Sequence, residues 1–310
     1  MNALPASVRA GVEAALAERS GESAAITGAA AVGGGCISPT ARVDTHAGPF
    51  FLKWGSPDLP DGLLAAEARG LRQLGRANEV RVPDVVAESS GDAPGHGSGA
   101  HDGPAWLLLE WLEPGSAAPD AWARLGTRLA ALHRHQADAF GADADNYIGS
   151  LPQANGPLDS WPAFWRGRRL EPQLRQAIDR GLMDDTDHRR FDALFGRLDE
   201  ILAPGNDDGP SLLHGDLWGG NVHMMIDGTA AIIDPSVYHG HREVDLAMAD
   251  LFGGFGHAFH AAYDDAWPLH AGYDPTRRAV YQLYYLLVHV NLFGRGYVGR
   301  TRSALEAAGF

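Results

Sequence analysis

Lysine and cysteine are almost absent from this chain of 310 residues. Lys53 is the single lysine beside 24 arginines, and Cys36 is the single cysteine. One cysteine excludes a disulfide within the chain. Because arginine fills every other cationic position, we expect Lys53 to lie where a compact ammonium is needed and a planar guanidinium would not fit. The alternative is that one lysine survives by chance.

The chain also lacks long apolar runs and an excess of positive charge. No stretch approaches the length of a membrane helix, and residues 1–20 have no basic-then-apolar signal pattern. The net charge is −14. The closely spaced histidines have no matching second pair at the spacing of a zinc site, so their pattern does not predict one. We therefore expect a cytoplasmic protein that binds neither membranes nor nucleic acid.

One stretch, residues 212–222, places a set of polar side chains between apolar flanks. It has the pattern His-x-Asp-Leu-x-x-x-Asn, from His214 to Asn221, and an apolar strand ending in Asp234 follows. This spacing is typical of the kinase catalytic loop and its second metal ligand. It predicts Asp216 as the base that takes the acceptor proton, with Asn221 and Asp234 as ligands of Mg²⁺. The alternative is that all three are turn residues and strand-end caps.

The amino-terminal part reads as strands and one helix around a possible phosphate site. We expect strands at 24–32, 42–45 and 50–54, and a helix at 61–78. The loop Gly33-Gly34-Gly35-Cys36 allows close approach of backbone amides to phosphates, although a plain hairpin would have the same composition. Glu67 interrupts the apolar face of the helix, and Lys53 is its expected ion-pair partner. A solvated Glu67 at the edge of that face is the alternative.

Beyond this part, the pattern predicts a connector and then a mainly helical region. Strands are expected at 82–87 and 106–111, with a polar loop at 89–103 between them. The segment Glu110-Trp111-Leu112 would contact adenine through its backbone, as the connector of kinases does, and the lobe boundary falls between residues 110 and 111. Helices are expected at 4–19, 120–136, 161–180, 191–202 and 276–293, and from 245 onward, where Asp245 caps the helix or braces the catalytic loop.

These residues together resemble the fructosamine kinase (ketosamine kinase) family, within the aminoglycoside-phosphotransferase-like kinases. The matching pieces run through nearly the whole chain. They are residues 33–38, 44–45 with 51–53, 145–149, 161–165 with 168–170, 214–221 and 238–243. The eight residues 214–221, with Trp218 among them, are more specific than the general kinase loop.

The resemblance implies an α+β, two-lobed, protein-kinase-like fold, with a small antiparallel-sheet lobe at 1–110 and a larger, mainly helical lobe at 111–310. It implies ATP-dependent phosphorylation of the third-carbon hydroxyl of a ketosamine, on free amines or glycated protein lysines, with Mg²⁺. Trp218 resembles a sugar-stacking residue, with core packing as the alternative. His214, Asn146 and Tyr147 are further expected substrate contacts.

Cys36 carries an expectation of its own. Backbone amides gathered in the glycine loop would favour its thiolate, which makes Cys36 a candidate for oxidation. The alternative is a buried, inert cysteine that packs under the loop. We expect a monomer, with a disulfide-linked dimer through Cys36 as the alternative; such dimers are known in the family.

Two other functions remain open from the sequence. One is an aminoglycoside or amino-alcohol phosphotransferase of the same fold, because spacing does not define the acceptor pocket. The other is a non-enzymatic nucleotide-binding scaffold, which the presence of the base, both metal ligands and the lysine disfavours.

Overall fold

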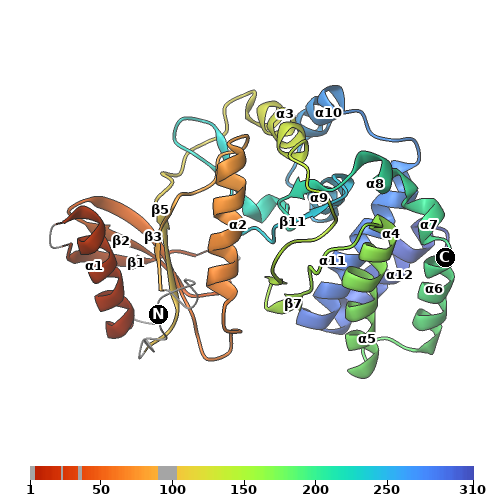
Figure 1. Ribbon diagram of the computed structural model, residues 1–310, viewed down its shortest axis with the longest axis horizontal. Coiled ribbons are helices and arrows are strands. Elements are labelled where there is room, and N and C mark those ends of the chain that lie inside the picture. Colours follow the sequence, from red (N-terminus) through yellow and green to blue (C-terminus); the bar gives the residue numbers. More distant parts are fainter. Residues whose placement is uncertain (1–3, 22–23, 34–36, 90–102) are drawn as a thin grey trace.

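A computed structural model describes residues 4–21, 24–33, 37–89 and 103–310 of the chain. A five-stranded sheet lies at one end and a group of helices at the other (Figure 1). The sheet is antiparallel throughout, in the order β1-β2-β3-β5-β4. Its strands are β1 (Ile26–Ala31), β2 (Thr40–Thr45), β3 (Gly48–Trp54), β4 (Val85–Glu88) and β5 (Trp106–Glu110).

Two helices cover opposite faces of this sheet (Figure 1). The side chains of β5 alternate in direction: Trp106 and Leu108 pack with α1 (Ala6–Ser20), whereas Leu107 and Leu109 pack with α2 (Leu63–Ala77). The same alternation in β3 puts Lys53 on the α2 face, where a charged side chain needs a partner. Both helices end at a left-handed residue, Gly21 and Asn78.

The remainder of the chain is mainly helical, with three short antiparallel strand pairs. After β5 the chain leads to α3 (Ala121–His133), which packs against α10 (His257–Ala266). The strand pairs are β6 (Asn146–Ile148) with β7 (Leu151–Gln153), β8 (Ser211–Leu213) with β11 (Tyr238–Gly240), and β9 (Val222–Met224) with β10 (Ala230–Ile232).

One long helix is the centre of the helical part. It is α11 (Arg278–Phe293), whose buried side chains fill the larger core cluster. Around it lie α4 (Trp161–Phe164), α5 (Glu171–Asp179), α6 (Asp185–Phe195), α7 (Leu198–Ile201), α8 (Ala203–Asp208), α9 (Glu243–Leu251) and α12 (Val298–Ala307). Single turns at Gly219–Asn221 and Arg295–Tyr297 are 3₁₀-helical, and Tyr273–Arg277 is π-helical.

Two expected helices differ from the structure. Residues 161–180 form α4 and α5 separated by a π-helical stretch, Trp165–Leu170, rather than one α-helix. The helix expected at 191–202 begins earlier, because Asp184 caps α6 by accepting from the amides of Thr186 and Asp187. It is also interrupted after Phe195, and α7 is a separate turn. The lobe boundary at residues 110 and 111 stays a prediction. None of the helices in the described ranges has the length and apolar character needed to cross a bilayer.

Candidate active site

Asp216 lies in a tight loop that follows the buried strand β8. The side-chain nitrogen Nδ2 of Asn221 donates to the backbone carbonyl of Asp216 at 2.8 Å and to its carboxylate at 3.3 Å. Gly215 has a φ of +83°, and a Cβ there would lie 2.0 Å from the Ser236 carbonyl oxygen. Only glycine therefore allows the loop to approach the segment that follows Asp234 so closely.

The carboxyl group of Asp216 has an unusual environment. Protein encloses it on most sides, although it reaches the cavity surface. This burial, with the nearby carboxylate of Asp234, raises the pKa of Asp216 to about 7, and the hydrogen bond from Asn221 opposes the shift. A carboxyl group with a pKa near neutrality is suited to accept a proton from an alcohol.

Lys53 joins the sheet, α2 and the end of the β10 segment. Its Nζ lies 2.7 Å from the carboxylate of Glu67 and 2.5 Å from that of Asp234. The predicted Lys53–Glu67 pair is therefore confirmed. Burial raises the pKa of Glu67, and the Lys53 ammonium acts in the opposite direction. Asp234 has a left-handed φ of 54°, a conformation that costs energy for a non-glycine residue and is often found at functional sites.

Two cavities meet at Asn221 and Asp234. The first is bounded by the connector residues Glu110, Trp111 and Leu112. The rest of its lining includes Val32, Gly33, Phe51, Leu109, Val222 and Ile233. The second cavity contains Asp216 and Trp218. Asn221 and Asp234 line both cavities, so the two spaces share these oxygen-bearing side chains.

The donor atoms at this junction suit a hard divalent cation. Because the Asn221 amide nitrogen already donates to Asp216, Oδ1 is the atom that Asn221 can offer to a metal. Asp234 adds a carboxylate. Mg²⁺ is commonly bound by one or two such side chains together with substrate phosphates, so these residues fit it.

The connector is fixed by side chains that the sequence patterns did not identify. Arg81 pairs with the Glu110 carboxylate, and His223 donates from Nε2 to the Leu112 carbonyl at 3.0 Å. The Glu110 side chain therefore has a structural partner, although only its backbone was expected to matter. Gly34, Gly35 and Cys36 lie outside the described residues.

Three of the four expected substrate residues line the second cavity: Trp218, Tyr147 and Asn146. However, the Tyr147 hydroxyl donates to the Asp61 carbonyl at 2.7 Å, and the Asn146 amide bonds Val237 and Gln153. These polar groups stabilise the cavity wall.

The expected substrate contact of His214 does not match the structure. Its ring is fully buried, donates from Nε2 to the Ile233 carbonyl and accepts from the Asp216 amide at Nδ1. Its hydrogen bonds therefore stabilise the conformation of the loop that carries Asp216 from within the core. Trp218 is partly buried, and its ring meets Phe252 edge-on at 6.3 Å between centroids, so it both packs and faces the cavity.

Comparison with known proteins identifies the family. Residues 9–308 match the fructosamine kinase family. The chain belongs to this family. A probable ketoamine kinase of Synechocystis is 38% identical over 89% of this chain and 88% of its own length, and a chloroplastic protein-ribulosamine 3-kinase of Arabidopsis thaliana is 34% identical over 92% and 84%.

Solved structures agree with this assignment. A Thermobifida fusca protein assigned as a fructosamine-3-kinase superposes with a TM-score of 0.82 at 37% identity, covering 96% of this chain and 98% of its own. The aminoglycoside phosphotransferase APH(4)-Ia, at 16% identity and a TM-score of 0.58, shares the fold alone. The expected two-lobed, protein-kinase-like α+β fold is confirmed, and the chain is an ATP-dependent phosphotransferase that acts on a hydroxyl group. The ketosamine kinase expectation is confirmed at the level of the family.

Behind the loop that carries Asp216 lies a brace on α9. The buried carboxylate of Asp245 accepts from the His214 amide at 2.7 Å and from the Gly215 amide at 2.9 Å. His133 contacts the same carboxylate, and the Tyr285 hydroxyl donates to the Gly215 carbonyl. We expected Asp245 either to cap the helix or to brace the loop, and the structure shows the second role.

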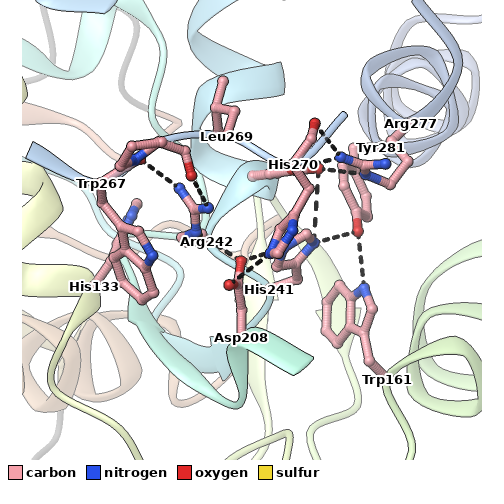
Figure 2. A network of polar contacts seen from close by, with 12 residues as sticks. His133, Trp161, Asp208, His241, Arg242, Trp267, Leu269, His270, Arg277 and Tyr281 are labelled. Carbon is pink, nitrogen blue, oxygen red and sulfur yellow. Dashed lines mark hydrogen bonds and ion pairs between the residues drawn. The ribbon is translucent and has the colours of Figure 1, made fainter. Parts of the chain in front are cut away.

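A second network, buried except at His270, anchors the start of α9 (Figure 2). The Asp208 carboxylate accepts hydrogen bonds from Nε2 of His241 at 2.9 Å, Nε of Arg242 at 2.7 Å and Nε2 of His270 at 2.8 Å. The Tyr281 hydroxyl joins it through Nδ1 of His241 (Figure 2). Three donors outweigh the effect of burial and hold the pKa of Asp208 well below its usual range. The sequence patterns missed this network because its members come from four separate segments.

Proposed function

We propose that this protein transfers the γ-phosphoryl group of ATP, with Mg²⁺, to the third-carbon hydroxyl of a ketosamine. The observation that carries the proposal is the junction of two cavities at Asn221 and Asp234, with Asp216 on one side and the connector on the other. In-line transfer needs this order of donor, metal ligands and base.

Each residue at the junction has a role in this proposal. Asp216 takes the proton of the acceptor hydroxyl as its oxygen attacks the γ-phosphorus, and ADP leaves with the electrons of the broken P–O bond. Asn221 and Asp234 would hold the metal, whose charge offsets that of the phosphates. Lys53, kept in place by Glu67, positions the phosphates once ATP is bound.

The acceptor side of the proposal rests on Trp218. It lines the cavity with Asp216, and an indole face suits the C–H side of a sugar ring. The ketoamine kinase and ribulosamine kinase relatives support a ketosamine in this cavity. Phosphorylation of such adducts on amines or on protein lysines would serve the repair of glycation.

A phosphorylation screen tests the acceptor. Purified protein, ATP and Mg²⁺ are incubated with fructosamine and ribulosamine adducts, an aminoglycoside and choline, and ADP release is measured. We expect turnover of the ketosamines, with the product phosphate on the third carbon by NMR. Turnover of the aminoglycoside or choline alone would replace the proposal with the alternative kinase, and ATP binding without turnover of any acceptor would favour a scaffold.

We also propose that the activity is sensitive to oxidation through Cys36. As the only cysteine it can bridge two chains or form a sulfenic acid or a mixed disulfide. Non-reducing electrophoresis and activity after mild peroxide treatment test this in wild type and Cys36→Ser. Equal loss of activity without dimers in both proteins would contradict it.

A further inference from the structure

An apolar surface continues outward from the acceptor cavity. Phe252, at the end of α9, meets His289 of α11 at 4.7 Å between ring centroids, and His289 in turn meets Phe293 at 5.4 Å and Tyr297 at 4.9 Å. We call these four residues the aromatic shelf. Each step is within the range of aromatic contact, so the rings form one continuous surface.

One contact joins a shelf residue to the cavity wall, and a second brings the neighbour of another shelf residue close to that wall. On one side, Trp218 lines the cavity and packs edge-on against Phe252. On the other, Gly149 also lines the cavity, and a Cβ there would lie 2.9 Å from the side chain of Leu292, the neighbour of Phe293 on α11. The shelf is therefore a continuation of the cavity wall.

The exposure of the shelf is unusual for this protein. Within the described residues, three large apolar side chains are prominently exposed: Ile37, Phe293 and Ile226. Phe293 is 65% exposed, and Ile37 lines the acceptor cavity. Two of the three thus lie along the same path, whereas Ile226 lies on the turn between β9 and β10. Grouped apolar exposure beside a cavity is a feature of binding surfaces.

His289 belongs to this apolar surface rather than opposing it. Its Nδ1 donates to the Tyr285 carbonyl at 2.7 Å. Burial, the largest influence, lowers the pKa of His289, so that the ring is neutral near pH 7. Arg300 covers Phe252 at 5.1 Å and donates to the Leu251 carbonyl, which fixes the guanidinium as the border of the shelf.

We propose that the aromatic shelf binds the substituent on the acceptor's amine and makes the enzyme prefer ketosamines whose amine carries an apolar or aromatic group. The inference rests on the proposed function, because it assumes that the sugar lies against Trp218 near Asp216. An amine substituent that leaves the cavity on the side of Trp218 that packs against Phe252 meets the shelf. The shelf offers that substituent an apolar path, on which it is removed from water.

A matched pair of acceptors tests the proposal. Ketosamines with one sugar are made from methylamine and from 4-phenylbutylamine, and KM and kcat are measured for both. In wild type we expect the phenylbutyl compound to have the lower KM. In Phe293→Ser the ratio of the two KM values should shift about fivefold against the phenylbutyl compound, the size of one lost aromatic contact, with kcat preserved. Phe293→Leu should shift the ratio less.

Ile226→Ser is the control, since it removes a similarly exposed apolar side chain that does not line the cavity or the shelf. It should leave the ratio unchanged. Turnover of both ketosamines with the same ratio in wild type, Phe293→Ser and Ile226→Ser would overturn the shelf but not the kinase function. Turnover of neither ketosamine by wild type would overturn both.

Discussion

The carboxylate of Asp245 lies 2.9 Å from the backbone nitrogen of Gly215, the residue directly before Asp216. Its other oxygen accepts from the His214 amide at 2.7 Å. Two consecutive peptide groups are therefore held by one side chain of α9. Because Gly215 has a left-handed φ, these bonds stabilise a loop conformation that the chain would otherwise adopt rarely. We expect the geometry of the base to depend on Asp245 although that residue does not face the cavity.

Replacing Asp245 with asparagine should lower kcat by on the order of 10²-fold and leave nucleotide affinity nearly unchanged. The amide keeps an acceptor oxygen, but it turns an N–H₂ group towards a backbone donor and removes a buried charge, at a cost of about 3 kcal/mol in stability. Steady-state kinetics, nucleotide titration and melting curves measure the three effects. Asp250→Asn on the same helix is the control, because its pairs with His260 and Arg278 are partly exposed. Equal behaviour of the two variants would contradict a bracing role.

Replacing Asp216 with asparagine should reduce phosphoryl transfer by roughly 10²- to 10⁴-fold, the usual cost of losing a general base. The substitution conserves shape and keeps the contact with Asn221 available, so nucleotide binding should persist. Single-turnover rates and titration with a nucleotide analogue measure the two properties separately. Turnover close to that of wild type would remove Asp216 from the mechanism.

Lys53→Arg should be nearly as damaging as Lys53→Ala. Lys53 is 3% exposed, and its ammonium reaches two carboxylates from separate segments, Glu67 at 2.7 Å and Asp234 at 2.5 Å. A planar guanidinium is larger and has a fixed donor geometry, so it cannot reproduce this arrangement. Both variants should lose on the order of 10²-fold in kcat/KM, equivalent to about 3 kcal/mol for a broken buried pair. An active arginine variant would show that charge alone is sufficient.

The Asp208 network should make part of the stability dependent on pH. Burial alone would raise the pKa of Asp208, but hydrogen bonds from His241, His270 and Arg242 lower it in the folded protein. The carboxyl group therefore binds a proton less readily when folded than when unfolded. Its contribution to the free energy of unfolding is complete above the unfolded pKa of about 4 and is lost as the pH falls through the lower folded value.

Asp208→Asn should accordingly unfold about 3 kcal/mol more easily at neutral pH, since Arg242 loses its carboxylate partner. As the pH falls below about 5, the free energy of unfolding of the variant should then decrease less than that of wild type. Denaturant titrations at each pH would measure the difference. Asp207→Asn, one residue earlier on α8 and exposed, is the control and should follow wild type. A variant with the same acid slope as wild type would exclude Asp208 as the source.

Local chemistry explains which parts of this molecule could be predicted from its sequence. The Lys53–Glu67 pair was predictable because strand alternation and helical spacing each leave one charge on an apolar face, and each charge requires the other. The proximity of Asp216 and Asn221 was predictable because they lie five positions apart in one loop. Both inferences use short-range patterns with a direct chemical reason.

Contacts between distant segments were not predictable in this way. Nothing near Asp208 in the sequence indicates that His241, Arg242 and His270 converge on it, because the folding of α8, α9 and the segment after α10 brings them together. His214 was misassigned for a related reason: its motif position is beside the base, but a buried ring bonded to Ile233 cannot be distinguished from an exposed one by spacing. The π-helical stretch at Trp165–Leu170 likewise keeps a helical composition.

The scarcity of lysine has a consequence for the enzyme itself. Sugars modify proteins by condensing with an unprotonated, accessible amine, and lysine side chains are the usual targets. Here the single lysine side chain is held beneath the surface as an ammonium between two carboxylates. A protein that acts on sugar–amine adducts thus presents no exposed lysine on which such an adduct could form. Its own lysine side chain is therefore shielded from the reaction that forms such adducts.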